Sequence, residues 1–253
     1  MKSVVSNVFI ALRLRLASRN EIIAMKKTLI AVIVCLVGAY ISSYVHAQQG
    51  QKVAVSEILG ERKEYYFDDD KPGELPAGFQ SAFTGKGEPG LWIVKKIEHA
   101  PSADNVVVQT KQGDTDYRFP LLILDGVSYK DFMAFVRFRA VSGKTDQAGG
   151  LVFRYKDNNN YYVVRANALE NNVRLYTVIN GNRRQIAGKN TKVTSSEWHL
   201  LKVVCKADKI QCFFDNAKVI EATDDTFDRG SVGLWTKADS YTYFDDLVAQ
   251  EVK

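Results

Sequence analysis

Hydrophobic and polar residues alternate along short runs from residue 64 onward, and turn-forming residues separate the runs. Alternation with a period of two is typical of strands that bury one face, and almost no stretch carries a helical period over three turns. The pattern predicts fourteen strands, at residues 64–67, 91–97, 105–110, 120–124, 132–141, 149–155, 161–167, 173–179, 183–186, 198–206, 209–214, 218–221, 231–236 and 241–248.

Fourteen short strands require two sheets, and the turns between them favour hairpins. The turns at residues 157–160, 180–182 and 215–216 are rich in Asn, Asp and Gly, which tolerate left-handed backbone conformations. We expect one all-β domain over residues 64–250, a two-sheet antiparallel jelly-roll sandwich. Residues 48–63 are polar and weakly patterned, and we interpret them as a linker or a loosely docked first segment.

Residues 25–47 have the pattern of a secretory signal peptide. Two lysines precede an apolar run at residues 29–40, and a cleavage site follows that ends at Ala47. A transmembrane anchor is the alternative, but polar residues interrupt the run short of the roughly 20 apolar residues that a membrane span needs. We expect a secreted or periplasmic protein with no stable membrane span after cleavage.

Residues 1–24 do not fit this interpretation, because a signal peptide normally begins near the initiating methionine. Met25 stands directly before the two lysines and is a better start than Met1. We therefore interpret residues 1–24 as a non-native N-terminal extension.

The charge of the chain is concentrated in this leader. The formal net charge is +5, and residues 1–47 carry six basic residues and one acidic residue. The remaining residues carry 28 basic and 28 acidic side chains, so the body of the protein is neutral. A neutral body lacks the attraction for polyanions that nucleic-acid binding requires, and we expect no nucleic-acid partner.

Cys205 and Cys212 are the two cysteines beyond the leader. A hairpin that turns at Ala207 and Asp208 places Cys205 opposite Ile210, so that the two sulfur atoms are diagonal neighbours, a poor arrangement for a disulfide. A register slipped by one residue on each strand would place the cysteines directly opposite each other. We favour two buried thiols, and the disulfide remains the alternative.

Three segments carry a resemblance to a known family. They are the C-terminal DDTFDRGSVGLWTKADSYTYFDDLVAQ, the hairpin and tail WHLLKVVCKADKIQCFFDNAKVIEATDDTF, and the central AGGLVFRYKDNNNYYVVRANALENNVRLY. They resemble the 3-keto-disaccharide hydrolase domain family, secreted bacterial jelly rolls of the concanavalin A-like lectin and glucanase type. The likeness covers roughly residues 64–250 and implies a concave sheet that handles sugars. Hydrolysis does not follow from the fold, because lectins, glucanases and structural modules share it.

Two classes of function therefore remain open for a carbohydrate-recognising protein. One is an enzyme that hydrolyses a glycosidic bond of a 3-keto-disaccharide or a glycan fragment. The other is a non-catalytic carbohydrate-binding or extracytoplasmic structural module.

Catalytic residues stay unknown at this level. Glycoside hydrolysis typically needs two carboxylates across the scissile bond, and the Glu-x-Asp-x-x-Glu run that family-16 glucanases place on one strand is missing from the sequence. Candidate acids lie in loops and at strand ends, where a solvated charge is the ordinary alternative: Asp116, Asp146, Glu170, Glu221 and Asp239. His99 and His199 follow the leader without a nucleophile elbow, so a serine-hydrolase site is not supported.

Alternation across the 157–160 turn divides two neighbouring strands into two faces. The apolar face holds Leu151, Phe153, Tyr155, Tyr162, Val164 and Ala166. The other face carries Arg154, Tyr161, Arg165 and Asn167, which supply the directional donors and stacking surface that sugar hydroxyls need. We predict that these four residues bind substrate on the concave face. The alternative is a solvated outer sheet whose arginines pair with acids.

The tryptophans and one loop give weaker indications. Trp198 and Trp235 are expected in the core, whereas the position of Trp92 stays open. The loop at residues 236–240 offers Lys237 and Asp239 at a sheet end, either as part of a rim site or as an ordinary charged turn.

A structural calcium ion is a further candidate, because folds of this type often hold Ca²⁺ between the first and last strands. Residues 68–70 and 245–246 bring five carboxylates to those strands. Asp246 shares a face with Phe244 and Val248, so we predict Asp246 as the metal ligand. The alternative is that these acids are edge charges that oppose aggregation. The sequence assigns no other cofactor.

Overall fold

The computed structural model describes Ile41 and residues 59–252 of the 253-residue chain. Residues 59–252 form fifteen strands, one more than predicted. They form no helix, as the alternating pattern predicts. No helix among the described residues has the length and apolar character needed to cross a membrane. The strands are β1 Leu59–Tyr65, β2 Phe79–Gly85, β3 Trp92–Lys96, β4 Asn105–Gln109, β5 Arg118–Leu124, β6 Phe132–Ser142, β7 Ala148–Asp157, β8 Asn160–Asn167, β9 Asn172–Ile179, β10 Asn182–Asn190, β11 His199–Lys206, β12 Lys209–Phe214, β13 Ala217–Thr223, β14 Ser231–Trp235 and β15 Tyr241–Val252.

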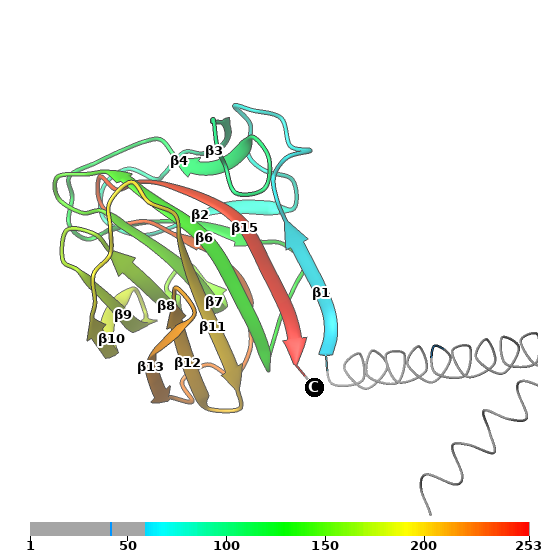
Figure 1. The fold of residues 1–253 in the computed structure, drawn as a ribbon. Helices are drawn as coiled ribbons and strands as arrows, with labels where there is room; N and C mark the ends of the chain where they lie inside the picture. Colours follow the sequence, from blue (N-terminus) through cyan, green and yellow to red (C-terminus); the bar gives the residue numbers. More distant parts are fainter. Residues whose placement is uncertain (1–40, 42–58, 253) are drawn as a thin grey trace, which may run out of the picture. The chain divides into compact units, whose positions relative to one another are not determined.

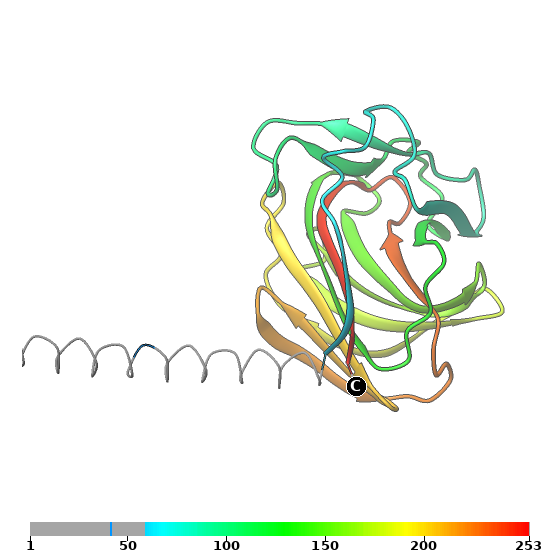
Figure 2. The ribbon, with the colours of Figure 1, turned by 90° about the vertical axis from the view of Figure 1, so that its right-hand side faces the viewer.

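Two antiparallel sheets form a jelly-roll sandwich (Figure 1). The eight-stranded sheet, called sheet A, has the order β13-β12-β11-β6-β15-β4-β3, and β1 pairs with β15. The seven-stranded sheet, called sheet B, has the order β10-β9-β8-β7-β14-β5-β2. Figure 2 shows the strands curving around a shared interior. The predicted all-β, two-sheet antiparallel sandwich is confirmed.

Two strands differ from the sequence prediction. β2 is missing from it, because this edge strand buries only Phe79 and Thr84 and its other positions are exposed or half-buried without alternation. β1 begins at Leu59, inside the segment 48–63 that was interpreted as a linker, and it pairs with β15. Its central residues are mostly charged, so hydrophobic alternation does not reveal the strand.

The main core lies between the two sheets and includes Phe138 of sheet A and Phe153 of sheet B. Gly149 allows the sheets to approach closely, because a Cβ atom at this position would lie 2.7 Å from the Phe138 ring. Trp92, whose position was open, is buried in this core. Trp198 lies instead in a smaller cluster with Val108, because it alternates with His199 and faces outward from sheet A.

A second core covers the opposite face of sheet B. It consists of Phe119, Leu121, Ile123, Ala148, Val152, Tyr161, Val163, Tyr176, Val178 and Trp235. Within residues 59–252 this face is not covered by another sheet. Instead, sheet B curls so that its distant strands come into contact. Thr84 of β2 lies 3.0 Å from the Tyr161 hydroxyl of β8, and the Tyr117 hydroxyl donates to the Gly181 carbonyl at 2.8 Å. Trp235 is therefore in a core, as expected, but not in the main one.

The β11–β12 hairpin has the predicted register. Cys205 pairs with Ile210 and Cys212 pairs with Val203, which matches a turn at Ala207 and Asp208. Both cysteines are buried and free. The prediction of two buried thiols is confirmed, and the slipped register that would favour a disulfide is excluded.

Candidate functional site

Arg154 does not share a face with the other predicted binding residues. It has a left-handed backbone with φ of 47°, inside an irregularity of the β7–β8 pairing between Phe153 and Asp157. Its side chain is 1% exposed and donates to three backbone carbonyls, those of Phe227 at 3.0 Å, Lys130 at 3.0 Å and Ala207 at 2.6 Å. The prediction that Arg154 and Arg165 converge on one groove is therefore wrong. Alternation fails here because the bulge places Arg154 on the face predicted for Tyr155, and Tyr155 on the face predicted for Arg154.

Tyr155 takes the place that alternation gave to Arg154. It was expected on the apolar face with Phe153, but it packs beside the second core, with its ring centroid 6.1 Å from that of Tyr161. Burial raises the pKa of Tyr155 to about 12, so its phenol stays protonated at neutral pH.

Tyr161 lies on the predicted face, but that face is not open at this point. The Tyr161 side chain is fully buried in the second core with Val152 and Val163. The concave sheet surface expected from the sequence is therefore filled by hydrophobic side chains where sheet B curls. Polar side chains line the border of this core.

Arg165 and Asn167 lie beside this core and are themselves buried, at 4% and 1% exposed, in a polar network. Arg165 donates to Glu170 at 2.7 Å and to the Tyr176 hydroxyl at 3.2 Å, and it also contacts Asn172. Asn167 donates to Asp146 at 2.9 Å. The Asn167 amide oxygen also accepts the backbone N–H groups of Leu169 and Glu170, which fixes the turn that carries Glu170.

Six charged side chains gather here from segments that are distant in the sequence. We call them the charged cluster: Asp116, Asp146, Arg165, Glu170, Arg183 and Lys237. Lys237 joins its two halves, because its Nζ lies 2.5 Å from Asp116 and 2.9 Å from Asp146. With three cations and three anions, the cluster offers donors and acceptors without a net charge. The loop at residues 236–240 therefore contributes the buried Lys237 to this cluster, and a rim site at this loop stays a prediction.

The pKa values of the cluster's carboxyl groups are shifted in different directions. Burial raises the pKa of Asp146 although Lys237 opposes the shift, and the side chain of Asp146 is only 2% exposed. Burial also acts on Glu170, but Arg165 and Asn172 outweigh it and lower the pKa of Glu170. A hydrogen bond from Lys237 lowers the pKa of Asp116. Burial thus favours the protonated form of Asp146, whereas neighbouring donors favour the ionised form of Glu170.

Arg183 connects the charged cluster to a second polar region. Its guanidinium carbon lies 4.7 Å from the Phe119 ring centroid and 4.4 Å from that of Tyr176, so it covers part of the second core. Its backbone N–H donates to the Tyr117 hydroxyl, which in turn donates to the Gly181 carbonyl. Gly181 begins the second region, because its N–H donates to the Asn159 carbonyl.

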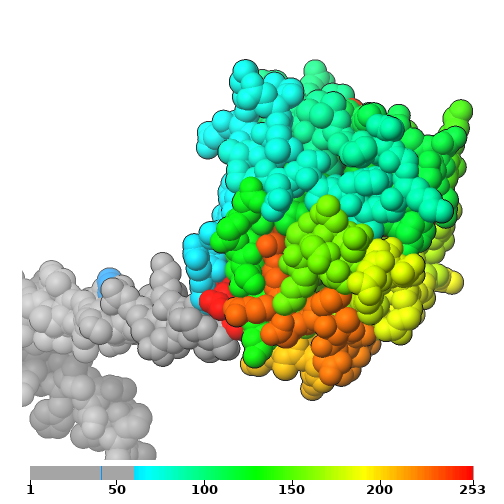
Figure 3. Space-filling view, turned by 180° about the vertical axis from the view of Figure 1, so that it is seen from behind, coloured from blue at the N-terminus to red at the C-terminus, as the bar shows by residue number. Residues whose placement is uncertain are grey.

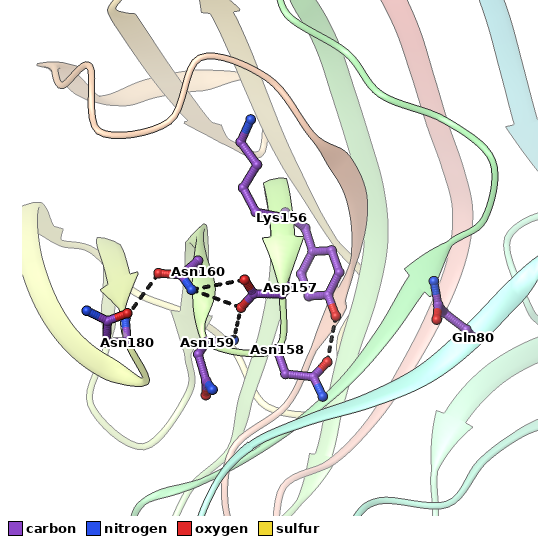
Figure 4. A pocket seen from close by; sticks show the side chains of 8 residues that line it. Gln80, Lys156, Asp157, Asn158, Asn159, Asn160 and Asn180 are labelled. Carbon is purple, nitrogen blue, oxygen red and sulfur yellow. Dashed lines mark hydrogen bonds between the residues drawn. The ribbon is translucent and has the colours of Figure 1, made fainter.

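That second region is an open pocket of about 660 Å³, which we call the asparagine pocket (Figure 4). Its lining comes from β2, the β7–β8 turn and the β9–β10 turn: Gln80, Tyr155, Lys156, Asp157, Asn158, Asn159, Asn160 and Asn180. In Figure 4, Gln80 stands apart from the asparagines, on the side of β2. Figure 3 shows the light green β7–β8 segment at the surface beside the orange loop before β14. A bound molecule can therefore reach this region from solvent.

Hydrogen bonds hold the pocket in shape. Asp157 accepts the Asn159 N–H at 2.7 Å and the Asn160 side-chain amide at 2.9 Å (Figure 4). The Tyr155 hydroxyl donates to the Asn158 side chain at 2.6 Å. The side chains of Asn159 and Gln80 make no hydrogen bond within residues 59–252, and both face solvent. The pocket therefore combines a fixed frame with free amide groups, and amides both donate and accept.

The sequence did not predict this pocket. Its pattern indicated only turns at residues 157–160 and 180–182, because single turns rich in Asn and Asp are common. The four consecutive polar residues of the first turn were the available signal. Gln80 gave none, because β2 itself was missed.

The other candidate residues have structural roles. Asp239 accepts the backbone N–H groups of Lys144 and Asp146 at 2.6 and 2.9 Å, and Glu221 bonds to Lys218 and Gln211. His199 contacts Asp215 at 2.8 Å and lies between Asp215 and the Thr194 backbone. His99 is exposed.

Asp246, the predicted calcium ligand, contacts Arg137 at 2.8 Å. The three carbonyls of Phe67, Asp68 and Asp70 accept from one Asn105 side-chain amide at 3.1–3.3 Å. No group of three or more metal-ligating side chains occurs within the part of the chain that the structure describes. Calcium binding at Asp246 would require Arg137 to move, and the calcium site stays a prediction.

Known proteins share this architecture. The carbohydrate binding module CBM66 from Bacillus subtilis aligns with a TM-score of 0.53 and 23% identity, over 67% of this chain and 93% of the module. Domain 4 of AbnA, a GH43 extracellular arabinanase from Geobacillus stearothermophilus in complex with arabinotriose, aligns with a TM-score of 0.51 and 14% identity, over 76% of this chain and 94% of the domain. At these identities the likeness shows the fold.

Sequence comparison gives a relative and a family. Levanase of Bacillus subtilis (strain 168) is 30% identical over 128 residues, which span 50% of this chain but only 19% of levanase. Residues 78–248 match the 3-keto-alpha-glucoside-1,2-lyase-like domain family, a range that runs from the start of β2 into β15 and includes both polar regions. The resemblance inferred from the sequence is confirmed, and the chain belongs to the 3-keto-alpha-glucoside-1,2-lyase-like domain family, a family of carbohydrate-related domains.

Proposed function

We propose that this domain recognises a neutral saccharide, and that the asparagine pocket is its binding site. The observation that carries the proposal is an open pocket of about 660 Å³ lined by five amide side chains and Tyr155. Ligand pockets commonly span about 300–1,000 Å³, so this volume suits a sugar of one or two residues.

The chemistry of the lining favours a polyhydroxyl ligand over a charged one. Lys156 and Asp157 are the two ionic residues of the lining and balance each other in charge, while the amides of Asn159 and Gln80 are free to contact hydroxyls. Tyr155 adds an aromatic ring that stays neutral. The similarity to a levanase and to arabinanase and carbohydrate-binding domains supports the same class of ligand. The leader pattern supports a site of action outside the cytoplasm.

Titration calorimetry on a saccharide selected from a glycan array tests this proposal. Asn159→Ala and Gln80→Ala each remove an amide that makes no hydrogen bond within the described residues, so the fold should persist. A lost hydrogen bond contributes about 0.5–1.5 kcal/mol, so each variant should bind roughly threefold to tenfold more weakly. Gln185→Ala, which removes an exposed amide of β10 outside the pocket lining, is the matched control and should bind as the wild type does. Wild-type affinity in both pocket variants would contradict the assignment.

A second candidate function is cleavage of a 3-keto-glucoside at the charged cluster. Its specific support is the pair of acids beside Arg165, because paired carboxyl groups with opposite pKa shifts are typical of acid–base catalysis. In a 3-keto-glucoside the carbonyl at C3 acidifies the proton on C2. Glu170 would remove that proton as Asp146 donates one to the departing glycosidic oxygen, leaving a C1–C2 double bond conjugated with the ketone.

The elimination product is an enone, and its ultraviolet absorbance gives a direct assay. Glu170→Gln and Asp146→Asn should each lower the rate by at least about a hundredfold, the contribution typical of a general acid or base. Glu221→Gln, an exposed acid outside the cluster, is the control. If the wild type leaves 3-keto-glucosides intact while the calorimetric binding persists, the domain is a binding module.

A further inference from the structure

The outer face of sheet A carries a row of alternating aromatic and cationic side chains. In order across the surface, it consists of Trp198, Arg139, Tyr243, Lys95 and Tyr241. We call it the aromatic–cation row. Arg139 and Tyr243 are paired neighbours on β6 and β15, and they alternate with Phe138 and Phe244 of the main core, so they face outward.

Each cation of the row lies against two rings. The Arg139 guanidinium carbon is 5.6 Å from the Trp198 ring and 5.3 Å from the Tyr243 ring. The Lys95 Nζ is 5.5 Å from the Tyr241 ring and 5.7 Å from the Tyr243 ring, and it donates to the Tyr241 hydroxyl at 2.9 Å. Both cations thus flank the ring of Tyr243, close enough for one small ligand to reach both.

Neither cation has an acidic partner within residues 59–252. Arg137 lies on β6 with Arg139 and pairs with Asp246 at 2.8 Å. Lys96 lies on β3 with Lys95 and pairs with Asp104 at 2.9 Å. Arg139 makes no such pair, and its Nε is buried without a hydrogen-bond partner. The hydrogen bond to the Tyr241 hydroxyl is the largest cause of the raised pKa of Lys95, so Lys95 stays charged. The row therefore holds two positive charges that pair with no carboxylate of residues 59–252.

We propose that the aromatic–cation row binds an acidic saccharide, a sugar that carries a carboxylate such as a hexuronate. The carboxylate accepts hydrogen bonds from Arg139, whose planar guanidinium matches two oxygens, and Lys95 donates to a hydroxyl or to the same group. The half-buried rings of Trp198 and Tyr241 offer apolar faces to the C–H groups of the sugar. The two cations favour an acidic ligand over a neutral one. The aromatic rings favour a saccharide over a flexible acidic chain, because they contact the C–H groups of the sugar.

This site is separate from the asparagine pocket, which lies on sheet B. Either binding proposal can therefore be refuted without the other. Binding of a galacturonic acid trisaccharide is measured by calorimetry against its neutral galactose counterpart, at low and high salt. We expect the acidic sugar to bind at least tenfold more tightly than the neutral one, and added salt to weaken it. The double variant Arg139→Gln with Lys95→Met should lose at least tenfold in affinity for the acidic sugar. Each replacement keeps much of the length of the original side chain.

Lys202→Met is the matched control, because Lys202 is another outward cation of sheet A, 4.2 Å from the single ring of Phe213. It removes the same type of charge and should change affinity less than twofold. Thermal melting of all variants establishes that they are folded, and Asn159→Ala should leave acidic-sugar binding unchanged. Equal wild-type affinity for the acidic and neutral sugars, or full affinity in the folded double variant, would overturn the proposal. Equal competition by poly-glutamate would overturn the assignment to a saccharide.

Discussion

Replacement of Arg154 by alanine should strongly destabilise the domain. Arg154 is buried and its guanidinium holds the carbonyls of Lys130, Ala207 and Phe227. These carbonyls belong to the loop before β6, the β11–β12 turn and the loop before β14. One side chain therefore ties together three loops at one end of the sandwich.

The magnitude follows from these three bonds. Hydrogen bonds that involve a charged group contribute roughly 1.5–3 kcal/mol each, but three bonds to one side chain are not additive, and burial of the charge offsets part of the gain. We expect Arg154→Ala to lower the free energy of unfolding by about 4 kcal/mol. For a domain of this size, that loss corresponds to a fall in Tm of roughly 8–16 °C.

Arg154→Gly distinguishes the contribution of the side-chain hydrogen bonds from the cost of the strained backbone. Both variants lose the three bonds, but alanine must hold the left-handed φ of 47°, which costs roughly 1–2 kcal/mol for a residue other than glycine. Glycine relieves that strain and loses part of the gain through its freer unfolded state. Arg154→Gly should therefore be more stable than Arg154→Ala by about 0.5–1 kcal/mol.

Urea unfolding followed by tryptophan fluorescence measures both variants, with Lys156→Ala as the control. Lys156 pairs with Asp228 at the surface, where ion pairs contribute at most about 1 kcal/mol. If Arg154→Ala costs less than about 1 kcal/mol, the three-loop contact does not stabilise the fold. A lower stability for glycine than for alanine would contradict the role assigned to backbone strain.

Further predictions concern pH, thiols, calcium and export. Burial raises the pKa of Asp245 to about 6, so the folded state binds a proton more tightly than the unfolded state, and stability should fall as the pH rises from about 4 to about 6; urea unfolding of Asp245→Asn should show a flatter dependence. Burial raises the pKa of Cys205 to about 12 and also raises that of Cys212. Alkylation followed by mass spectrometry should label both thiols only after unfolding, and a disulfide-linked mass would contradict this. If calcium binds at Asp246, it raises the wild-type Tm, and Asp246→Asn removes this gain. A wild-type Tm that changes with neither calcium nor chelator would refute the calcium site. Mass spectrometry of the exported protein should find an N-terminus at Gln48, and an exported chain that retains Met25 would refute cleavage.

Local sequence was sufficient where strand pairing depends on neighbours in the chain. The β11–β12 hairpin has the predicted register because its turn residues and its alternation agree, and the inward residues of β8 fall where the period of two places them. The failure at Arg154 has a different origin. Gly230 packs against the backbone of residues 154–155, where a Cβ would lie 2.4 Å from the Arg154 carbonyl carbon. That contact comes from a distant part of the chain, so the alternation pattern of β7 does not predict it.

The candidate sites depend on the curl of sheet B, which no single strand encodes. Asp116, Asp146 and Glu170 were named from the sequence as separate loop acids, and their convergence on Lys237 and Arg165 follows from how β5, β7 and β9 come together. The predicted open concave face was wrong because the same curl brings Thr84 to Tyr161 and covers the sheet. The proposed binding pocket therefore lies at the border of the second core.

The most direct test of the saccharide-binding proposal is a crystal structure of the domain with a saccharide selected by the glycan array. We expect a sugar in the asparagine pocket, with its hydroxyls hydrogen-bonded to the side chains of Asn159 and Gln80. A neutral saccharide bound elsewhere, with this pocket filled only by water, would contradict it.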